Sequence, residues 1–391
     1  MAVAALRIHP RSGATASVQS RALFTIAAAN ARKPAFVAAI ESCTRFGADA
    51  ASLSDFMALH PRDQMLTHSL AEHRHADTAL SQYFSIGIQQ YRVLSRIVEQ
   101  GFNDAARDID ILDFACGFGR LLRFLRCGHP DARLYAAEVQ RDALDFCATQ
   151  FGVTTIASTF EPSQFQPGRK FDVIWVASLF SHLPGPLFEQ WLHVLLSVLS
   201  ERGILCFSAR ALPADAPAAD ELVYRAQSEN AELDTKYYGT TWVSERLVRE
   251  LVTRRFGAAM HVQYAPRALA NEQDLYLVSR RTSDLAIEKG PWGWLDVRRR
   301  DADGSLELQG WSADLDAMRP AHVEIRIDAQ TFDVTPTIER PDVAAAFGNP
   351  ALDATGWRLC RRIERNHVEI VSVAASGARN IVYVGEAFAP T

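Results

Sequence analysis

The stretch that decides the fold is residues 109–120, which read IDILDFACGFGR. Its first half, residues 109–114, is an apolar run typical of a buried strand, and it leads directly into a turn that contains Gly117 and Gly119. Residues 121–125 follow with helix-forming side chains and one apolar face. Small residues in such a turn let the backbone approach a ligand closely, and the next helix offers unpaired N–H groups. The stretch therefore predicts a strand, a tight turn and a helix, with a ligand at the turn.

Strands and helices continue to alternate after this turn. The run FDVIWVASL, residues 171–179, is almost entirely apolar, as expected for a strand covered on both faces. Such alternation produces right-handed βαβ units, so we predict a doubly wound, Rossmann-like α/β fold with a mostly parallel sheet. Further strands are expected at 133–139, 153–157, 204–208, 260–264 and 274–279, and helices at 53–100, 141–151, 186–199 and 244–255, the last with Ser244 as its N-cap.

Beyond residue 293 the hydrophobic pattern changes to a period of two. Leu306 and Leu308, and then Val323, Ile325 and Ile327, alternate with polar residues. Several short runs of this kind predict a C-terminal all-β sandwich of antiparallel strands. The expected organisation is a poorly ordered leader (1–52), an N-terminal helical cap (53–105), an α/β domain (106–283), a linker (284–293) and a β-sandwich-like domain (294–391).

Composition restricts the classes of function. The chain has 391 residues with a net charge of -5, which gives no overall attraction to nucleic acid. No apolar run approaches the roughly 20 residues needed to cross a bilayer. The six cysteines form no C-x-x-C pair, which predicts no metal site and favours a cytoplasmic location. Residues 1–40 carry five Lys or Arg and no acid, so a targeting segment is the alternative to an unstructured leader.

Glu138 identifies the ligand class more closely. It stands nineteen residues after Gly119, at the end of the second expected strand, where a carboxylate can accept hydrogen bonds from both hydroxyls of a ribose. Leu122 replaces the third glycine of the dinucleotide fingerprint, which argues against NAD. A phosphate-free ligand with a ribose and an amino acid end fits better.

Three segments carry a resemblance to a known family. ILDFACGFGR at 111–120, AAEV at 136–139 and FDVIWVASLFSHLP at 171–184 resemble the class I S-adenosylmethionine-dependent methyltransferases, and the likeness covers about residues 82–280. It implies S-adenosylmethionine as cofactor, with its methionine end beside Asp113 and the glycines, its ribose at Glu138 and its adenine beside residues 158–160. The implied cofactor-binding set is Asp113, Ala115, Cys116, Gly117, Gly119, Glu138, Ser158, Thr159, Phe160 and Ser178.

His182 is the candidate catalytic residue. It follows the fourth expected strand, at the edge of the sheet where α/β sites form, and imidazole ordinarily titrates near neutrality. We therefore consider His182 as the general base of an O-methyltransferase; the alternative is a histidine that orders the loop before Pro184. The same segment lacks the Asn/Asp-Pro-Pro-aromatic signature of amino methylation of bases. A nucleic acid substrate is therefore not expected.

The acceptor is suggested by two looser resemblances. SLFSHLP (178–184) and YYGTTWVSE (237–245) resemble bacterial methyltransferases encoded among polysaccharide-building enzymes. The region beyond residue 304 is similar to a β-sandwich module appended to such enzymes and to glycosyltransferases. Tyr237, Tyr238 and Trp242 are candidate substrate residues that either stack on a sugar or pack their own segment onto the sheet.

The resulting prediction is an S-adenosylmethionine-dependent methyltransferase that methylates a hydroxyl of a glycan or sugar-containing acceptor. Two alternatives stay open: a methyltransferase acting on a small natural product, and a non-catalytic glycan-binding or assembly protein with a vestigial cofactor site. The four tryptophans Trp292, Trp294, Trp311 and Trp357 are expected to be core residues rather than a sugar-stacking face. The sequence does not indicate an oligomeric state.

Overall fold

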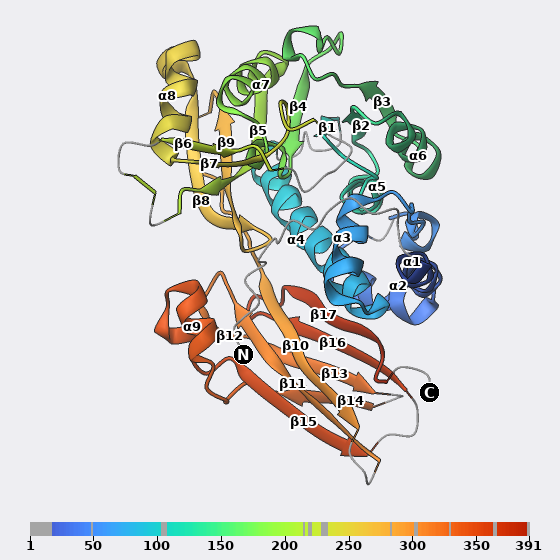
Figure 1. Ribbon diagram of the computed structural model, residues 1–391. Helices are drawn as coiled ribbons and strands as arrows, with labels where there is room; N and C mark the ends of the chain where they lie inside the picture. The colour runs from blue at the N-terminus through green and yellow to red at the C-terminus, as the bar shows by residue number, and fades with distance from the viewer. Residues whose placement is uncertain are drawn as a thin grey trace. The chain divides into compact units, whose positions relative to one another are not determined.

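The chain divides between two units within helix α4 (Ala76–Phe102), as a computed structural model shows (Figure 1). Unit 2 is made of residues 93–287, and unit 1 combines the described residues before 93 with those from 288 onward. The structure describes residues 18–47, 50–102, 108–213, 216–217, 221–227, 234–281, 284–300, 304–327, 330–362 and 366–388.

Unit 2 is built on a mixed, mostly parallel sheet. The strand order is β3-β2-β1-β4-β5, followed by β9 and β8, and only β9 among these runs antiparallel to β5. This confirms the predicted Rossmann-like fold class. The strands are β1 (Asp110–Phe114), β2 (Arg133–Glu138), β3 (Thr154–Ala157), β4 (Phe171–Val176), β5 (Leu199–Ala211), β6 (Leu222–Arg225), β7 (Thr240–Val243), β8 (His261–Leu269) and β9 (Gln273–Ser279).

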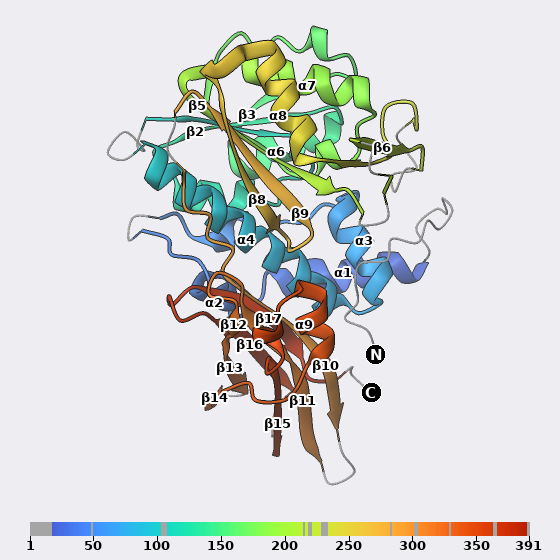
Figure 2. The same cartoon turned by 90° about the vertical axis from the view of Figure 1, so that its left-hand side faces the viewer.

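Helices cover both faces of this sheet (Figures 1 and 2). On one face α7 (Gly185–Ser197) and α8 (Glu245–Phe256) share a core cluster with alternate residues of β1, β4 and β5, and Trp191 and Leu195 are among the buried contacts. On the other side α5 (Leu122–Gly128) and α6 (Arg141–Phe151) contact β2. All six residues of β4 are buried, which explains why its sequence is apolar apart from Asp172, whose carboxylate is paired with Arg202.

Unit 1 joins N-terminal helices to two antiparallel sheets. The first sheet contains β10, β11, β12 and β15, the second has the order β14-β13-β16-β17, and their buried side chains share one cluster that includes Trp357 and Ile370. Its elements are α1 (Val18–Ala31), α2 (Pro34–Ser42), α3 (Gln64–His73), α9 (Pro341–Phe347), β10 (Pro291–Arg300), β11 (Ser305–Asp314), β12 (Arg319–Pro320), β13 (His322–Ile327), β14 (Gln330–Val334), β15 (Gly356–Arg362), β16 (His367–Val373) and β17 (Arg379–Glu386).

Two buried side chains of α4 tie the helical part of unit 1 to strand β17. The Asp77 carboxylate accepts a hydrogen bond from the backbone N–H of Glu386 at 2.9 Å, and the hydroxyl of Ser81 accepts one from the N–H of Val384 at 3.0 Å. Helix α2 also contacts β17. The N-terminal helices and the C-terminal strands therefore form one packed body.

Several elements differ from the expectations. The helix expected over 53–100 is broken into a short 3-10 helix Leu53–Phe56, α3 and α4, because Arg74 adopts a left-handed φ of 52° that ends α3. Residues 18–42, assigned to a leader, form α1 and α2, since alanine favours helix and Phe36 and Ile40 supply a buried face. The first 17 residues of that leader lie outside the described residues. Strand β10 begins inside the expected linker 284–293.

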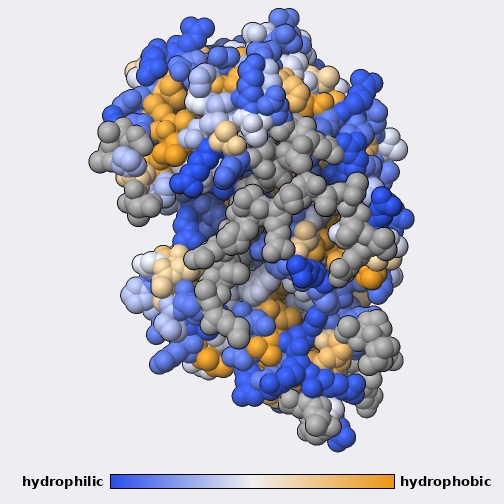
Figure 3. All heavy atoms as spheres, in the orientation of Figure 1, coloured by the Kyte–Doolittle hydropathy of each residue, from blue (hydrophilic) through white to orange (hydrophobic). Residues whose placement is uncertain are grey.

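The tryptophans of unit 1 are core or partly buried residues. Trp357 and Trp311 are buried, and Trp292 and Trp294 pack against the cluster around Trp311. On the face drawn in Figure 3, hydrophilic residues cover much of each unit and apolar residues occur in small groups. Within the ranges that the structure describes, no helix is both long and apolar enough to span a membrane.

Candidate functional site

The turn after β1 is shaped by residues with positive φ angles. Ala115, Gly117 and Gly119 have φ of 57°, 52° and 75°. A Cβ atom added at Gly119 would lie 2.4 Å from the ring of Phe151, so only glycine fits there. A Cβ at Gly117 would meet no atom within 4 Å, so space lies open beside this residue. The turn therefore presents bare backbone at the C-terminal edge of the sheet.

Glu138 is held against this turn by the backbone. Its carboxylate accepts hydrogen bonds from the N–H groups of Gly117 at 3.0 Å, Val139 at 2.7 Å and Gln140 at 3.2 Å. Burial raises the pKa of Glu138, and the three N–H groups oppose that rise. The residue as a whole is partly buried, and the three hydrogen bonds orient both carboxylate oxygens. This is the arrangement that a diol of a ribose requires.

Asp113 is the last residue but one of β1, two residues before Ala115, where the turn begins. Its side chain is 4% exposed, and burial raises its pKa to about 8. The charge of Arg120 lowers the pKa and that of Glu138 raises it further. The protein thus keeps a protonated carboxyl group at neutral pH, poised to ionise when a cation approaches.

The two cysteines of the turn region act through packing. The Cys116 and Cys147 thiols both contact the carbonyl oxygen of Gly117, at 3.4 and 3.5 Å. The hydrogen bond with Cys147 and burial hold the pKa of the Cys116 thiol well above its usual value. A neutral thiol of this kind is no nucleophile, so Cys116 contributes to the turn through packing and through its backbone.

The segment after β3 lies beside Glu138. The N–H of Ser158 donates to the Glu138 carbonyl oxygen at 2.9 Å, and the Thr159 hydroxyl donates to the carbonyl oxygen of Glu161 at 2.6 Å. Phe160 is 43% exposed, unusually high for a large apolar side chain in this chain. The three residues implied to lie by the adenine therefore follow the neighbouring strand at the same edge as Glu138.

Beyond β4, a polar network that sequence reasoning missed surrounds Ser178. Ser178 has a φ of 65° and its N–H donates to the Ser208 hydroxyl at 2.8 Å. The Gln273 amide donates to the Ser178 hydroxyl at 2.9 Å and accepts from Ser208 at 2.7 Å. Ser208 and Gln273 are buried at the ends of β5 and β9. Their only sequence signal is a polar residue at the end of an apolar strand, which is too common to single them out.

His182 is buried at the same edge. Its side chain is 5% exposed, and its Nδ1 atom lies 2.8 Å from the carbonyl oxygen of Gly239. Because a carbonyl oxygen only accepts, this hydrogen bond requires a hydrogen on Nδ1. In the neutral ring Nε2 is then the atom with the lone pair, which is the form a general base needs.

The substrate candidates come from an insertion between β5 and α8. Strand β7 pairs with the end of β5 through Arg210 and Trp242, and β6 pairs with β7; neither strand was expected. The Tyr238 ring stacks on the His182 ring with their centroids 4.3 Å apart, and the ring centroids of Tyr237 and Phe160 are 5.2 Å apart. The guanidinium of Arg225 covers the Trp242 ring at 5.1 Å. The structure thus brings Tyr237 and Tyr238 to the edge, whereas Trp242 packs on its own hairpin.

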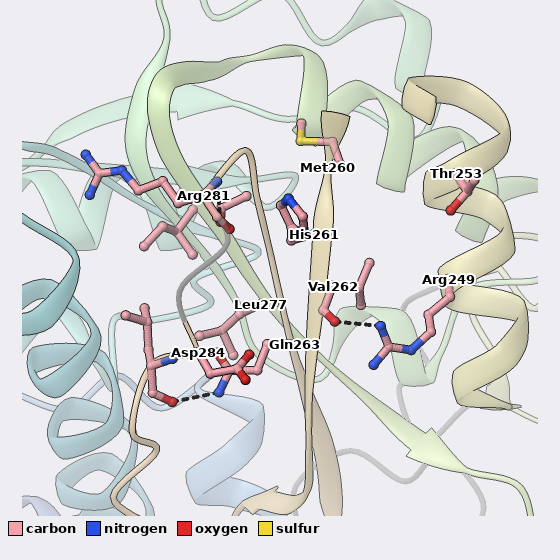
Figure 4. A pocket seen from close by; sticks show the side chains of 12 residues that line it. Arg249, Thr253, Met260, His261, Val262, Gln263, Leu277, Arg281 and Asp284 are labelled. Atoms are coloured by element: carbon pink, nitrogen blue, oxygen red, sulfur yellow. Dashed lines mark hydrogen bonds between the residues drawn. The ribbon is translucent and has the colours of Figure 1, made fainter. Parts of the chain in front are cut away.

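A pocket of about 270 Å³ occurs elsewhere, at the opposite edge of the sheet (Figure 4). It is lined by residues near the start of β5 and the end of β9, such as Ile204 and Ser279, which pair with each other. In Figure 4 Arg249 bonds the Val262 carbonyl oxygen, at 2.7 Å, so its charge is already engaged. Among the residues described, no cluster of His, Cys, Asp or Glu is arranged to hold a metal ion.

The residues at the glycine turn fit S-adenosylmethionine. Open space beside Gly117 admits a ligand to the backbone, and Glu138 presents an oriented carboxylate for ribose hydroxyls. The buried Asp113 carboxyl suits the ammonium group of a methionine end, because that cation offsets the cost of ionising it. Each of these groups comes from the edge formed by β1 and β2.

Comparison with known proteins agrees with this fit. Residues 111–203 match the family model of a methyltransferase domain. No curated protein matches the chain. Among solved structures, an S-adenosylmethionine-dependent methyltransferase from Clostridium acetobutylicum is 16% identical with a TM-score of 0.36, and covers 54% of this chain and 96% of its own.

Two proteins from Burkholderia thailandensis are also similar. A 1,6-didemethyltoxoflavin-N1-methyltransferase is 20% identical, covers 49% of this chain and 78% of its own, and has a TM-score of 0.35. An O-methyltransferase family protein is 16% identical, covers 57% and 64%, and has a TM-score of 0.35. These values are too low to carry an argument about the acceptor. The strand order, the glycine turn with Glu138 and the family match together identify residues 111–203 as part of a class I S-adenosylmethionine-dependent methyltransferase domain.

Proposed function

We propose that this methyltransferase acts on a hydroxyl group of a sugar-containing acceptor, such as a glycan intermediate, with His182 as general base. The observation that carries the proposal is the hydrogen bond between His182 Nδ1 and the Gly239 carbonyl oxygen, which makes Nε2 the proton acceptor of the neutral ring. An alcohol is a poor nucleophile until its proton is removed, and a positioned base contributes typically 10²–10⁴-fold.

The positions of Asp113, Glu138 and His182 assign each of these residues a separate role in the reaction. When bound, S-adenosylmethionine supplies a methyl group that is electrophilic without help from the protein. Asp113 would hold the ammonium group of the cofactor's methionine end at β1 and Glu138 its ribose at β2, while His182 follows β4. His182 accepts the hydroxyl proton of the acceptor, and alignment of the reactants at this edge lowers the barrier through position.

The acceptor side of the edge presents an aromatic surface. Tyr237 and Tyr238 are partly exposed rings, and Tyr238 stacks on His182, the proposed base. A partly exposed aromatic ring offers an apolar face on which a sugar ring stacks. These two rings support a sugar-containing acceptor next to His182.

Replacement of His182 by Gln tests the assignment of the base. We expect turnover at saturating cofactor to fall about 10²–10⁴-fold, with the dissociation constant of S-adenosylhomocysteine unchanged by calorimetry. His193→Gln is the matched control, because His193 lies on α7 and bonds the Leu251 carbonyl oxygen, away from the edge. If His182→Gln retained full turnover, His182 would not be the base.

Mass spectrometry identifies the acceptor. The enzyme is incubated with methyl-labelled cofactor and glycan extracts, and the expected product is a sugar that carries the label as an ether. Label found only on nitrogen, or only on sugar-free small molecules, would contradict the proposal.

The six cysteines, all of them among the described residues, form no disulfide, which supports placing the reaction in a reducing cytoplasm.

A further inference from the structure

The segment that contains Tyr238 is bonded directly to the segment that contains His182. The N–H of Gly239 donates to the His182 carbonyl oxygen at 2.8 Å, and His182 Nδ1 donates to the Gly239 carbonyl oxygen at 2.8 Å. The Thr241 hydroxyl donates to the carbonyl oxygen of Leu183 at 2.5 Å. Backbone and side chain of His182 are therefore both fixed by one short stretch of the insertion.

Gly239 permits this close approach. A Cβ atom at this position would lie 2.4 Å from the carbonyl oxygen of Arg225 and 2.6 Å from the hydroxyl of Tyr224. Any other residue would push the segment away from strand β6, and with it the carbonyl oxygen that holds His182. The hydrogen bond thus depends on how residue 239 is seated on the β6–β7 hairpin.

Residues 237–239, which we name the edge segment, also reach the cofactor side. Phe160 follows β3 and the edge segment precedes β7, and these strands stand five steps apart in the sheet, about 24 Å. The ring centroids of Tyr237 and Phe160 are nevertheless only 5.2 Å apart. Both segments must therefore extend inward over the ends of β4 and β1. Tyr237 points to the side of the cofactor, and its neighbour Tyr238 stacks on His182.

We propose that Tyr238 and the Gly239 carbonyl group are positioning elements for the reaction: they fix the ring plane and the tautomer of His182, while Tyr237 next to them lies on the cofactor side with Phe160. This inference rests on the proposed function of His182. The ring stack, at an interplanar angle of 12°, sets the plane, and the Nδ1 hydrogen bond sets which nitrogen carries the hydrogen. Together they direct the lone pair of Nε2 along one line.

The consequence for the proton is specific. A neutral imidazole in water exists in both tautomers, and only the form with the hydrogen on Nδ1 accepts a proton at Nε2. Without the Gly239 carbonyl group the hydrogen on Nδ1 would lose this acceptor, so that part of the population would carry the hydrogen on Nε2 instead. The number of productive encounters would fall although His182 remained present.

Two substitutions at position 238 separate positioning from simple packing. Tyr238→Phe keeps the stacked ring and is expected to retain kcat within about twofold. Tyr238→Leu keeps an apolar side chain of moderate size but removes the stack, and is expected to lower kcat about tenfold or more, part of the 10²–10⁴ that a base supplies. The affinity for S-adenosylhomocysteine should change less than threefold. Equal kcat for the two variants would overturn the inference.

The same substitution at Tyr237 should have a different effect. Tyr237→Leu removes the contact with Phe160 on the cofactor side, so its expected result is a weaker affinity for S-adenosylhomocysteine, by about threefold to tenfold. This is the size expected from an aromatic pair worth about 0.5–1.5 kcal/mol. Tyr238→Leu weakening the cofactor as much as Tyr237→Leu would contradict separate roles for the two tyrosines.

A spectroscopic measurement tests positioning without turnover. In ¹⁵N-histidine-labelled protein the ring shifts of His182, assigned by comparison with His182→Gln, report which nitrogen carries the hydrogen. We expect the Nδ1–H form in the wild type and in Tyr238→Phe, and a mixture in Gly239→Ala, whose Cβ atom would displace the carbonyl oxygen that bonds Nδ1. An unchanged tautomer in Gly239→Ala would overturn the inference. Full activity of His182→Gln would instead refute the proposed base, whatever the tautomer.

Discussion

Asp113 is a carboxyl group whose charge depends on the ligand. Burial raises its pKa to about 8, so below that pH the ligand-free protein carries a proton there. If the ammonium group of the cofactor binds beside it, Asp113 ionises, and the proton is released. We expect calorimetry at pH 6.5 in buffers of different ionisation enthalpy to show release approaching one proton for each S-adenosylhomocysteine bound, with affinity rising between pH 6 and 7.

The control for this prediction is Asp113→Asn, which has no proton to lose. It should bind the ligand more weakly and without proton release at pH 6.5, where the ligand's own ammonium, a group that titrates near pH 8, stays charged. Binding without proton release would exclude a cationic partner for Asp113.

Protein stability gives a second measurement of the Asp113 pKa. Between about pH 4 and 8 the carboxyl group of Asp113 holds its proton in the native state and not in the unfolded state. The free energy of unfolding of the wild type should therefore fall as pH rises through that window.

At the scale of elements, helix α8 has a side-chain cap that the sequence predicted. The Ser244 hydroxyl accepts a hydrogen bond from the N–H of Leu247 at 3.0 Å, and it also bonds the carboxylate of Glu221. Ser244→Ala should lower the free energy of unfolding by about 1 kcal/mol, measured in urea. Ser197→Ala is the control, because its exposed hydroxyl bonds only within the last turn of α7. An unaffected midpoint for Ser244→Ala would mean that water replaces the cap.

The elements of the sheet could be predicted because each carries a strong local pattern. The apolar run at 171–176 and the strand, turn and helix around Gly119 depend on residues close together in sequence. Strands β6 and β7 were not predicted. Strand β7 pairs with β5, and β6 pairs with β7, through contacts between residues distant in sequence, and four-residue strands show almost no hydrophobic periodicity. Helix α9 was missed for a similar reason: it is a single short run inside a region of alternating strands.

The site was predictable to the same extent. The glycine turn and Glu138 lie close in sequence to well-defined strands, and the structure joins them by the hydrogen bond from Gly117. Ser208 and Gln273 could not be found, because their roles come from a network that closes only when β5 and β9 pair. His182 was a candidate from its place after β4, but the tautomer depends on Gly239, 57 residues away in the chain.

On the scale of the whole molecule, the two units should unfold separately. Unit 1 depends on buried ties such as Asp77 to Glu386, whereas the cofactor residues all belong to unit 2. We expect two calorimetric transitions. S-adenosylhomocysteine at about 100 times its dissociation constant should stabilise only unit 2, by about 2.7 kcal/mol. Asp77→Ala should lower only the other transition, by about 1–3 kcal/mol. A single transition moved by both changes would show that the units unfold together.

The shared body of early helices and late strands has a consequence for biosynthesis. Residues 18–92 leave the ribosome before their partners from residue 288 onward have been made, and the roughly 200 residues of unit 2 come between. At translation speeds of about 5–20 residues per second, this delay lasts about 10–40 s. Unit 2 is continuous between residues 93 and 287 and can complete its sheet during that time. The buried face around Asp77 and Ser81 meanwhile stays uncovered, so nascent chains that stall in this interval are the ones a chaperone would have to protect.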